Sequence, residues 1–103
     1  MRRDPVLEGL KKHAGEAADF LLLLANEKRL LILFELSAAR EISVGDLVEA
    51  VGVSQSSLSQ HLAKLKAGGL VDTRREGQSI FYRLSWDNRV VQTLSLLKKL
   101  FGS

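Results

Sequence analysis

The chain has 103 residues, enough for one domain, and 46% of them are hydrophobic, so we expect an oligomer, because a small monomer buries little surface. Its formal net charge of +3 is modest, and the absence of cysteine excludes disulfides, thiolate metal sites and thiol redox chemistry. No apolar run has the length of a membrane span and residues 1–12 lack a signal-peptide core, so we expect a cytoplasmic protein.

The first predicted helix covers about residues 6–25 and is strongly apolar toward its end. Pro5 suits the first helical turn. The run FLLLLA is too apolar for a surface helix and belongs in the core or against another chain; we favour partial use in a dimer interface. The apolar band consists of Ala14, Ala17, Ala18, Leu21, Leu22 and Leu24.

Two further helices are predicted between residues 26 and 52. Asn26 has the side chain of an N-cap for a helix over about residues 27–37. After a short strand at Ile42, the motif Ser43-x-x-Asp46 resembles a capping box and starts the next helix. Gly52 ends that helix, because glycine readily adopts the left-handed conformation of a sharp turn.

A fourth helix, capped by Ser54, carries one narrow apolar stripe of Leu58, Leu62 and Leu65. Strands over residues 70–75 and 79–84 follow, joined by a turn at residues 76–78, because apolar and polar side chains alternate there. The last helix is predicted over about residues 86–101 with Ser85 or Asp87 as its cap. Its apolar stripe consists of Val90, Val91, Leu94, Leu97, Leu100 and Phe101.

This order of elements predicts a winged helix-turn-helix, mainly α with a small β-hairpin. We expect a single DNA-binding domain over residues 1–103. The helix-turn-helix covers about residues 43–67 and the wing about residues 70–84. The helices over about residues 6–25 and 86–101 are the expected dimerisation surfaces.

The outward face of the fourth helix has the chemistry of a DNA-reading surface. Glutamine pairs bidentately with adenine, serine bonds to base edges or phosphates, and lysine suits phosphate or guanine. No acid on this face repels phosphate. The candidate residues on the helix are Ser54, Gln55, Ser56, Ser59, Gln60, His61 and Lys64, and those on the wing are Arg74, Arg75, Gln78 and Ser79.

The pattern has interpretations other than DNA binding. A basic region is often only a solvated face, and a winged helix can serve as a protein-interaction module without DNA binding. An acidic recognition helix would indicate such a module, and the fourth predicted helix carries no acidic residue. An enzyme is not expected, because the chain has no cysteine nucleophile, glycine-rich phosphate loop or recognisable catalytic triad.

Nearly the whole chain resembles one family of bacterial regulators. The segments LANEKRLLILFEL, EISVGDLVEAVGVSQSSLSQHLAKLKAGGLV and TRREGQSIFYRL resemble the second helix, helix-turn-helix and wing of the ArsR/SmtB family, and most resemble its HlyU/BigR/NolR-like subgroup. The resemblance implies a homodimer formed through the first and last helices. It also implies binding to double-stranded DNA and repression of a promoter, relieved by an effector.

The effector chemistry of the family does not carry over. Metal-sensing members place cysteines near the start of the third helix, where this chain has Ser43 and Gly45, or ligands on the last helix, where it offers only Asp87. The subgroup's two sensing cysteines align with Phe34 and Gly102. We therefore expect neither a metal nor a dithiol sensor and no cofactor, and the resemblance leaves an unidentified small-molecule effector open.

Overall fold

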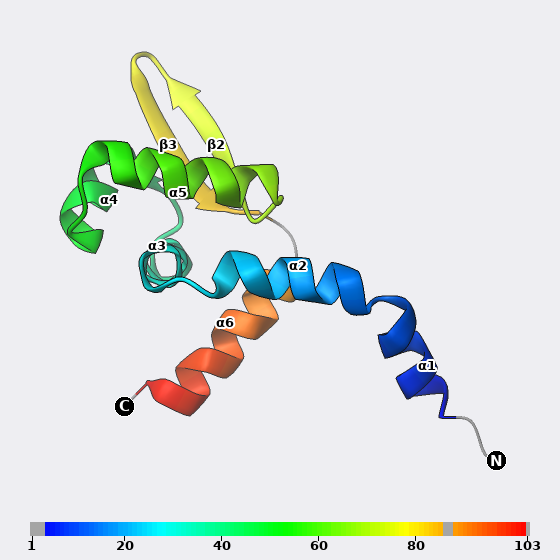
Figure 1. Ribbon diagram of the computed structural model, residues 1–103. Coiled ribbons are helices and arrows are strands. Elements are labelled where there is room, and N and C mark those ends of the chain that lie inside the picture. Colours follow the sequence, from blue (N-terminus) through cyan, green and yellow to red (C-terminus); the bar gives the residue numbers. More distant parts are fainter. Residues whose placement is uncertain (1–3, 86–87, 103) are drawn as a thin grey trace.

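A computed structural model describes residues 4–85 and 88–102 (Figure 1). Its helices and strands follow the winged-helix order that the sequence predicts. The sheet is antiparallel and three-stranded, in the order β1-β3-β2. The elements are α1 (Pro5–Lys12), α2 (Ala14–Leu24), α3 (Glu27–Ala38), β1 (Ile42–Ser43), α4 (Val44–Val51), α5 (Gln55–Ala67), β2 (Val71–Glu76), β3 (Ser79–Leu84) and α6 (Asn88–Phe101).

The prediction of a single N-terminal helix is wrong, because the structure has two helices there, α1 and α2. The first ends at His13, whose φ of −108° and ψ of 12° lie outside the helical range, and whose backbone N–H donates to the Gly9 carbonyl. Helix α1 buries none of its side chains, so no packing holds it in line with α2. Gly9 and Gly15, both poor helix formers, lie on either side of the break.

The three N-caps predicted from sequence are confirmed by hydrogen bonds. The Asn26 side-chain oxygen accepts from the Arg29 amide at 3.0 Å, and the Ser43 and Ser54 hydroxyls accept at 3.3 and 3.1 Å from amides three residues later. Gly52 ends α4 with a φ of 74°, in the left-handed region. These local signals fix where the two helices of the helix-turn-helix begin and where the turn lies.

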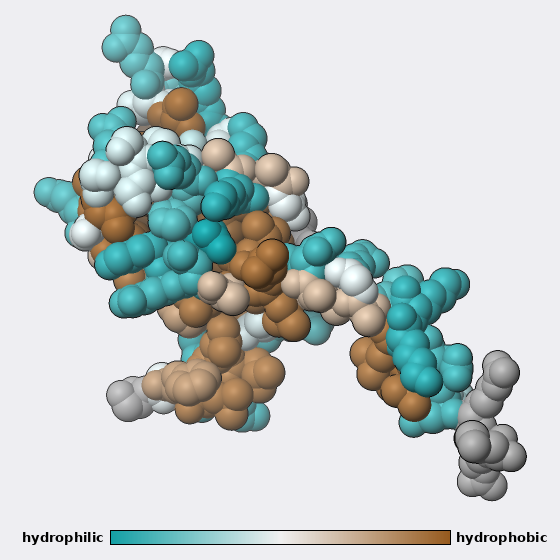
Figure 2. Space-filling model, viewed as in Figure 1, coloured by the Kyte–Doolittle hydropathy of each residue, from teal (hydrophilic) through white to brown (hydrophobic). Residues whose placement is uncertain are grey.

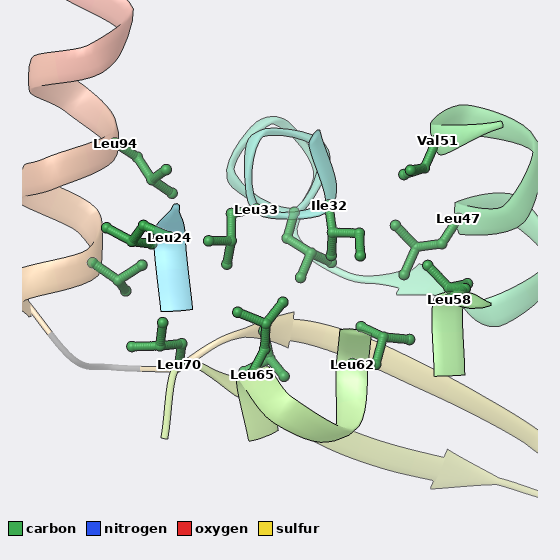
Figure 3. Packing of buried hydrophobic residues seen from close by; sticks show 13 residues of the cluster. Leu24, Ile32, Leu33, Leu47, Val51, Leu58, Leu62, Leu65, Leu70 and Leu94 are labelled. Atoms are coloured by element: carbon green, nitrogen blue, oxygen red, sulfur yellow. The ribbon is translucent and has the colours of Figure 1, made fainter. Parts of the chain in front are cut away.

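The hydrophobic core fixes which face of α5 points outward. The predicted stripe of Leu58, Leu62 and Leu65 is at most 1% exposed. Figure 3 shows these leucines directed toward Ile32 of α3 and Leu47 of α4. Because one side of α5 packs into this core, its opposite, polar side must face solvent. The remaining buried residues are Leu24, Leu33, Leu36, Val51, Leu70, Val71, Val90 and Leu94.

The hairpin turn is one residue shorter than predicted. Glu76 pairs with Ser79 at the end of the ladder, so only Gly77 and Gln78 form the turn. Gly77 has a φ of 61° at the first central position, where a type II′ turn takes glycine. The start of the last helix cannot be compared, because the predicted residues 86 and 87, including the Asp87 cap, lie outside the described residues.

Helices α1, α2 and α6 extend from the body of the molecule and expose apolar side chains (Figures 1 and 2). The radius of gyration is 15.8 Å, against about 13 Å for a compact domain of this size. Within the described residues, no helix has the length and hydrophobicity needed to cross a membrane. The exposed large apolar residues on α2 and α6 are Leu21, Leu22, Val91, Leu96, Leu100 and Phe101. An apolar surface of this kind is typical of a protein–protein interface.

Candidate nucleic-acid interface

The outward face of α5 combines exposed polar side chains with an absence of carboxylates. No residue of α5 is acidic, and Lys64 and Lys66 lie in its last turn. In Figure 2 the front of α5 is covered mainly by hydrophilic residues. Among the sequence candidates, the exposed ones on this helix and its cap are Ser54, Gln55, Ser56, Ser59, Gln60 and Lys64.

A shallow hollow brings the start of α5 and the wing turn together. It has a volume of about 380 Å³ and lies between Gln55 of α5, Gln78 and Ser79 of the wing, and the start of α4. Gln55 therefore borders the same concave surface as Gln78 and Ser79, which lie more than twenty positions later in the chain. Amide and hydroxyl groups arranged in this way can contact sugar, phosphate or base edges.

The two arginines of the wing lie on opposite faces of the hairpin. Side chains alternate along β2, so Thr73 and Arg75 share one face and Arg74 lies on the other. The Lys66 ammonium donates to the Thr73 hydroxyl at 3.3 Å, which identifies the face of Thr73 and Arg75 as the side of α5. Arg75 is therefore the wing arginine that lies on the same side of the hairpin as α5.

Arg74 is engaged in an ion-pair network that the sequence does not predict. Its guanidinium donates to Glu41 at 2.6 Å and to Glu76 at 3.1 Å, and it stacks 4.8 Å from the ring centroid of Phe81. The hydrogen bond from Arg74 holds the pKa of Glu41 below its ordinary value. The hydrogen bonds that Arg74 donates to Glu41 and Glu76 raise the pKa of its guanidinium. Arg74 reaches a DNA phosphate only by giving up these partners.

His61 lies apart from the other candidates on α5, because it faces α3. Its ring is half-buried, and the Arg29 guanidinium lies 3.4 Å from the ring Nδ1. Arg29 also donates to the carbonyls of Leu23 at 2.7 Å and Leu22 at 3.2 Å. Burial lowers the pKa of His61, and the charges of Arg29 and Lys64 lower it further. The neutral ring accepts a hydrogen bond from Arg29, and Arg29 thereby links α5 to the end of α2.

Stability is expected to fall on acidification through His61. Because its pKa is lower in the folded protein than its ordinary value of about 6.5, the unfolded chain binds more protons. The contribution to stability is therefore complete above about pH 6.5 and is lost as the pH falls below that value. Urea unfolding of wild type and His61→Gln at about pH 7.5 and about pH 5.5 measures the effect.

The wild type is expected to lose more of its free energy of unfolding between the two pH values than His61→Gln. His13→Gln removes the other histidine of the chain and serves as the control. An identical pH dependence for wild type and His61→Gln would contradict the role of His61.

The positions that align with sensing residues of related regulators carry no ligand cluster. Among the described residues, no group of three or more His, Cys, Asp or Glu side chains is placed to hold a metal ion. Ser43 is occupied as the N-cap of α4, and Phe34 is half-buried against the core. Asp87 lies outside the described residues.

The chain is similar to known regulators over most of its length. Residues 26–73 match the model of the family described as "Bacterial regulatory protein, arsR family". The chain is 51% identical to the nodulation protein NolR of Rhizobium meliloti, over 89% of this chain and 75% of that protein. It is 44% identical to the transcriptional activator HlyU of Vibrio cholerae, over 92% of this chain and 86% of that protein.

Solved structures of similar proteins share the fold. Reduced HlyU from Vibrio cholerae superimposes with a TM-score of 0.85 at 43% identity, covering 93% of this chain and 99% of that one. The transcriptional repressor BigR from Xylella fastidiosa gives a TM-score of 0.85 at 36% identity, covering 93% of this chain and 96% of that one. The likeness extends over the helix-turn-helix, the wing and the flanking helices.

Proposed function

The chain belongs to the arsR family of bacterial regulatory proteins and is a DNA-binding transcriptional regulator, and we propose that it acts as a homodimeric repressor at a palindromic operator. Its relatives are regulators rather than enzymes. The observation that carries the proposal is the acid-free polar face of α5, held outward by the buried leucine stripe. In this proposal α5 enters the major groove and the wing contacts the flanking backbone.

The proposed contacts divide into base reading and backbone binding. Glutamines and serines on the exposed face of α5 read base edges, and Lys64 and Arg75 neutralise phosphates. Arg74 and His61 contribute less to DNA binding, because each is already bound to other side chains. The residues assigned to direct contact are Ser54, Gln55, Ser56, Ser59, Gln60, Lys64, Arg75, Gln78 and Ser79.

A symmetric dimer would present two copies of α5 to successive grooves on one side of the duplex. That arrangement requires a separation of roughly 34–36 Å and a palindromic site. The exposed apolar side chains of α2 and α6 support pairing of two copies. Bound in this way to promoter DNA in the nucleoid, the dimer would exclude polymerase.

The direction of regulation needs its own test, because one similar protein is named an activator and another a repressor. Genomic footprinting of the native protein would identify the operator and its neighbouring genes. A reporter placed behind that operator should then show lower expression when the protein is present. Higher expression would overturn repression while leaving DNA binding intact.

Gln60→Ala is expected to weaken binding to the operator by about 1–3 kcal/mol and to leave binding to random DNA nearly unchanged. Gln60 is exposed on α5, and alanine removes the amide that reads a base without changing the charge. Mobility shifts on both DNAs at two salt concentrations measure the two affinities. Gln92→Ala, the same change on exposed α6, is the matched control, and sedimentation checks that it stays dimeric, because position 92 lies one helical turn before Leu96. An unchanged operator-to-random ratio for Gln60→Ala would remove Gln60 from the reading surface.

A further inference from the structure

A second hollow, larger than the one beside the wing turn, is lined by Arg74 and Arg83, which lie on the face of the hairpin opposite Arg75. It has a volume of about 680 Å³ and lies between α3, the sheet and α6; we name it the α3–α6 hollow. Its volume falls within the range of small-molecule sites. The apolar part of its lining consists of Leu36, Ala39, Leu84, Val91 and Leu94.

Cationic side chains border the same hollow. Arg40, Arg83 and Lys98 line it, and within the described part of the chain no carboxylate lies within ion-pair distance of any of the three. Lys98 donates to the neutral hydroxyl of Ser37 at 2.6 Å. Glu41, the acidic residue of the lining, is already paired with Arg74. The charges of Arg83 and Arg40 also help to lower the pKa of Glu41, so this one carboxylate is shared among three arginines. The hollow therefore combines apolar walls with a surplus of positive charge.

We propose that the α3–α6 hollow is a binding site for a small organic anion with an apolar body, such as a medium-chain carboxylate. The carboxylate would lie between Arg40 and Arg83, where arginine forms charge-assisted bonds with a planar anion. The hydrocarbon would lie against the leucines of α3 and α6, from which it would displace water. A neutral molecule of the same length would gain only the contact of its hydrocarbon with the leucines, without the charge-assisted bonds to arginine.

The Arg74–Glu41 pair connects this site to the wing. Arg74 is on β2, Glu41 precedes β1, and both line the hollow. An anion beside Arg83 competes with Glu41 for Arg74 and loosens the ion pair between the wing and the segment that precedes β1. Occupancy therefore changes the position of Arg75 and lowers operator affinity; this step rests on the proposed DNA-binding function.

The binding step is tested on the full chain without DNA. Isothermal titration with octanoate is expected to show saturable binding, and 1-octanol, its neutral match, is expected to bind at least about tenfold more weakly. Arg83→Gln should weaken octanoate binding about tenfold or more. Arg75→Gln, the same substitution on the opposite face of the hairpin, should leave it unchanged.

A second variant fills the hollow without changing charge. Ser95 lines it from an exposed position of α6, so Ser95→Phe should abolish octanoate binding while thermal unfolding shows a folded protein. Equal binding of octanoate and octanol, or equal affinity of the Arg83→Gln and Arg75→Gln variants, would overturn the site. So would octanoate binding that persists in folded Ser95→Phe.

The coupling step has a separate readout. Saturating octanoate should weaken operator binding by wild type and have no effect on Ser95→Phe. If octanoate binds but operator affinity does not change, the coupling is overturned and the anion site stands. If neither protein binds DNA in the absence of octanoate, the proposed function fails, and the titration without DNA still decides the anion site.

Discussion

A protein carrying both Leu96→Glu and Leu100→Glu is expected to be monomeric and to bind operator DNA about 10²–10⁴-fold more weakly than wild type. The two leucines lie one helical turn apart on α6 and share a face. They are 54% and 65% exposed in the single chain, so glutamate at these positions leaves the fold of one subunit intact. In a dimer interface the same change buries charges without partners. Loss of pairing removes the second half-site contact.

Sedimentation and operator titration measure this effect together. Wild type is expected to sediment as a particle of twice 11.4 kDa and the double variant as one of 11.4 kDa. Lys99→Glu changes the net charge by the same two units at the adjacent position on α6, so it controls for the electrostatic loss of DNA affinity. A monomeric wild type, or a dimeric double variant, would contradict the proposed interface.

Leu62→Ala is expected to lower the free energy of unfolding by about 2–5 kcal/mol. Leu62 is 1% exposed and lies between two other buried leucines of α5 (Figure 3). Truncation loses the transfer free energy of the side chain and leaves a cavity among α3, α4 and α5. Because small domains are stable by only about 5–15 kcal/mol, the loss is a large fraction of the total.

Urea unfolding followed by circular dichroism gives the value for Leu62→Ala. Gln60→Ala places alanine on the opposite, exposed face of the same helix and is expected to change stability by no more than about 0.5 kcal/mol. The two variants thus separate the structural face of α5 from its DNA-reading face. A Leu62→Ala loss as small as that of Gln60→Ala would mean that the stripe does not anchor the helix.

Local signals predicted the parts of the fold that neighbouring residues determine. Asn26, Ser43 and Ser54 cap helices because their side chains reach backbone amides three residues away. Leu58, Leu62 and Leu65 are buried because their spacing matches one side of a helix. The polar composition of the outward face of α5 follows from the same periodicity, so the sequence predicts most of the candidate interface.

The sequence by itself determined the order of the elements, the helix caps and the polar face of α5, because each depends on contacts within a few residues. Only the tertiary structure decided that α1 and α2 separate at His13 and that His61 faces Arg29. It also decided that Arg74 pairs with Glu41, on the face of the hairpin opposite Arg75. Arg29 and Glu41 lie 32 and 33 positions from their partners. Sequence periodicity describes the direction of a side chain relative to its own element, and the packing of elements decides what that side chain meets.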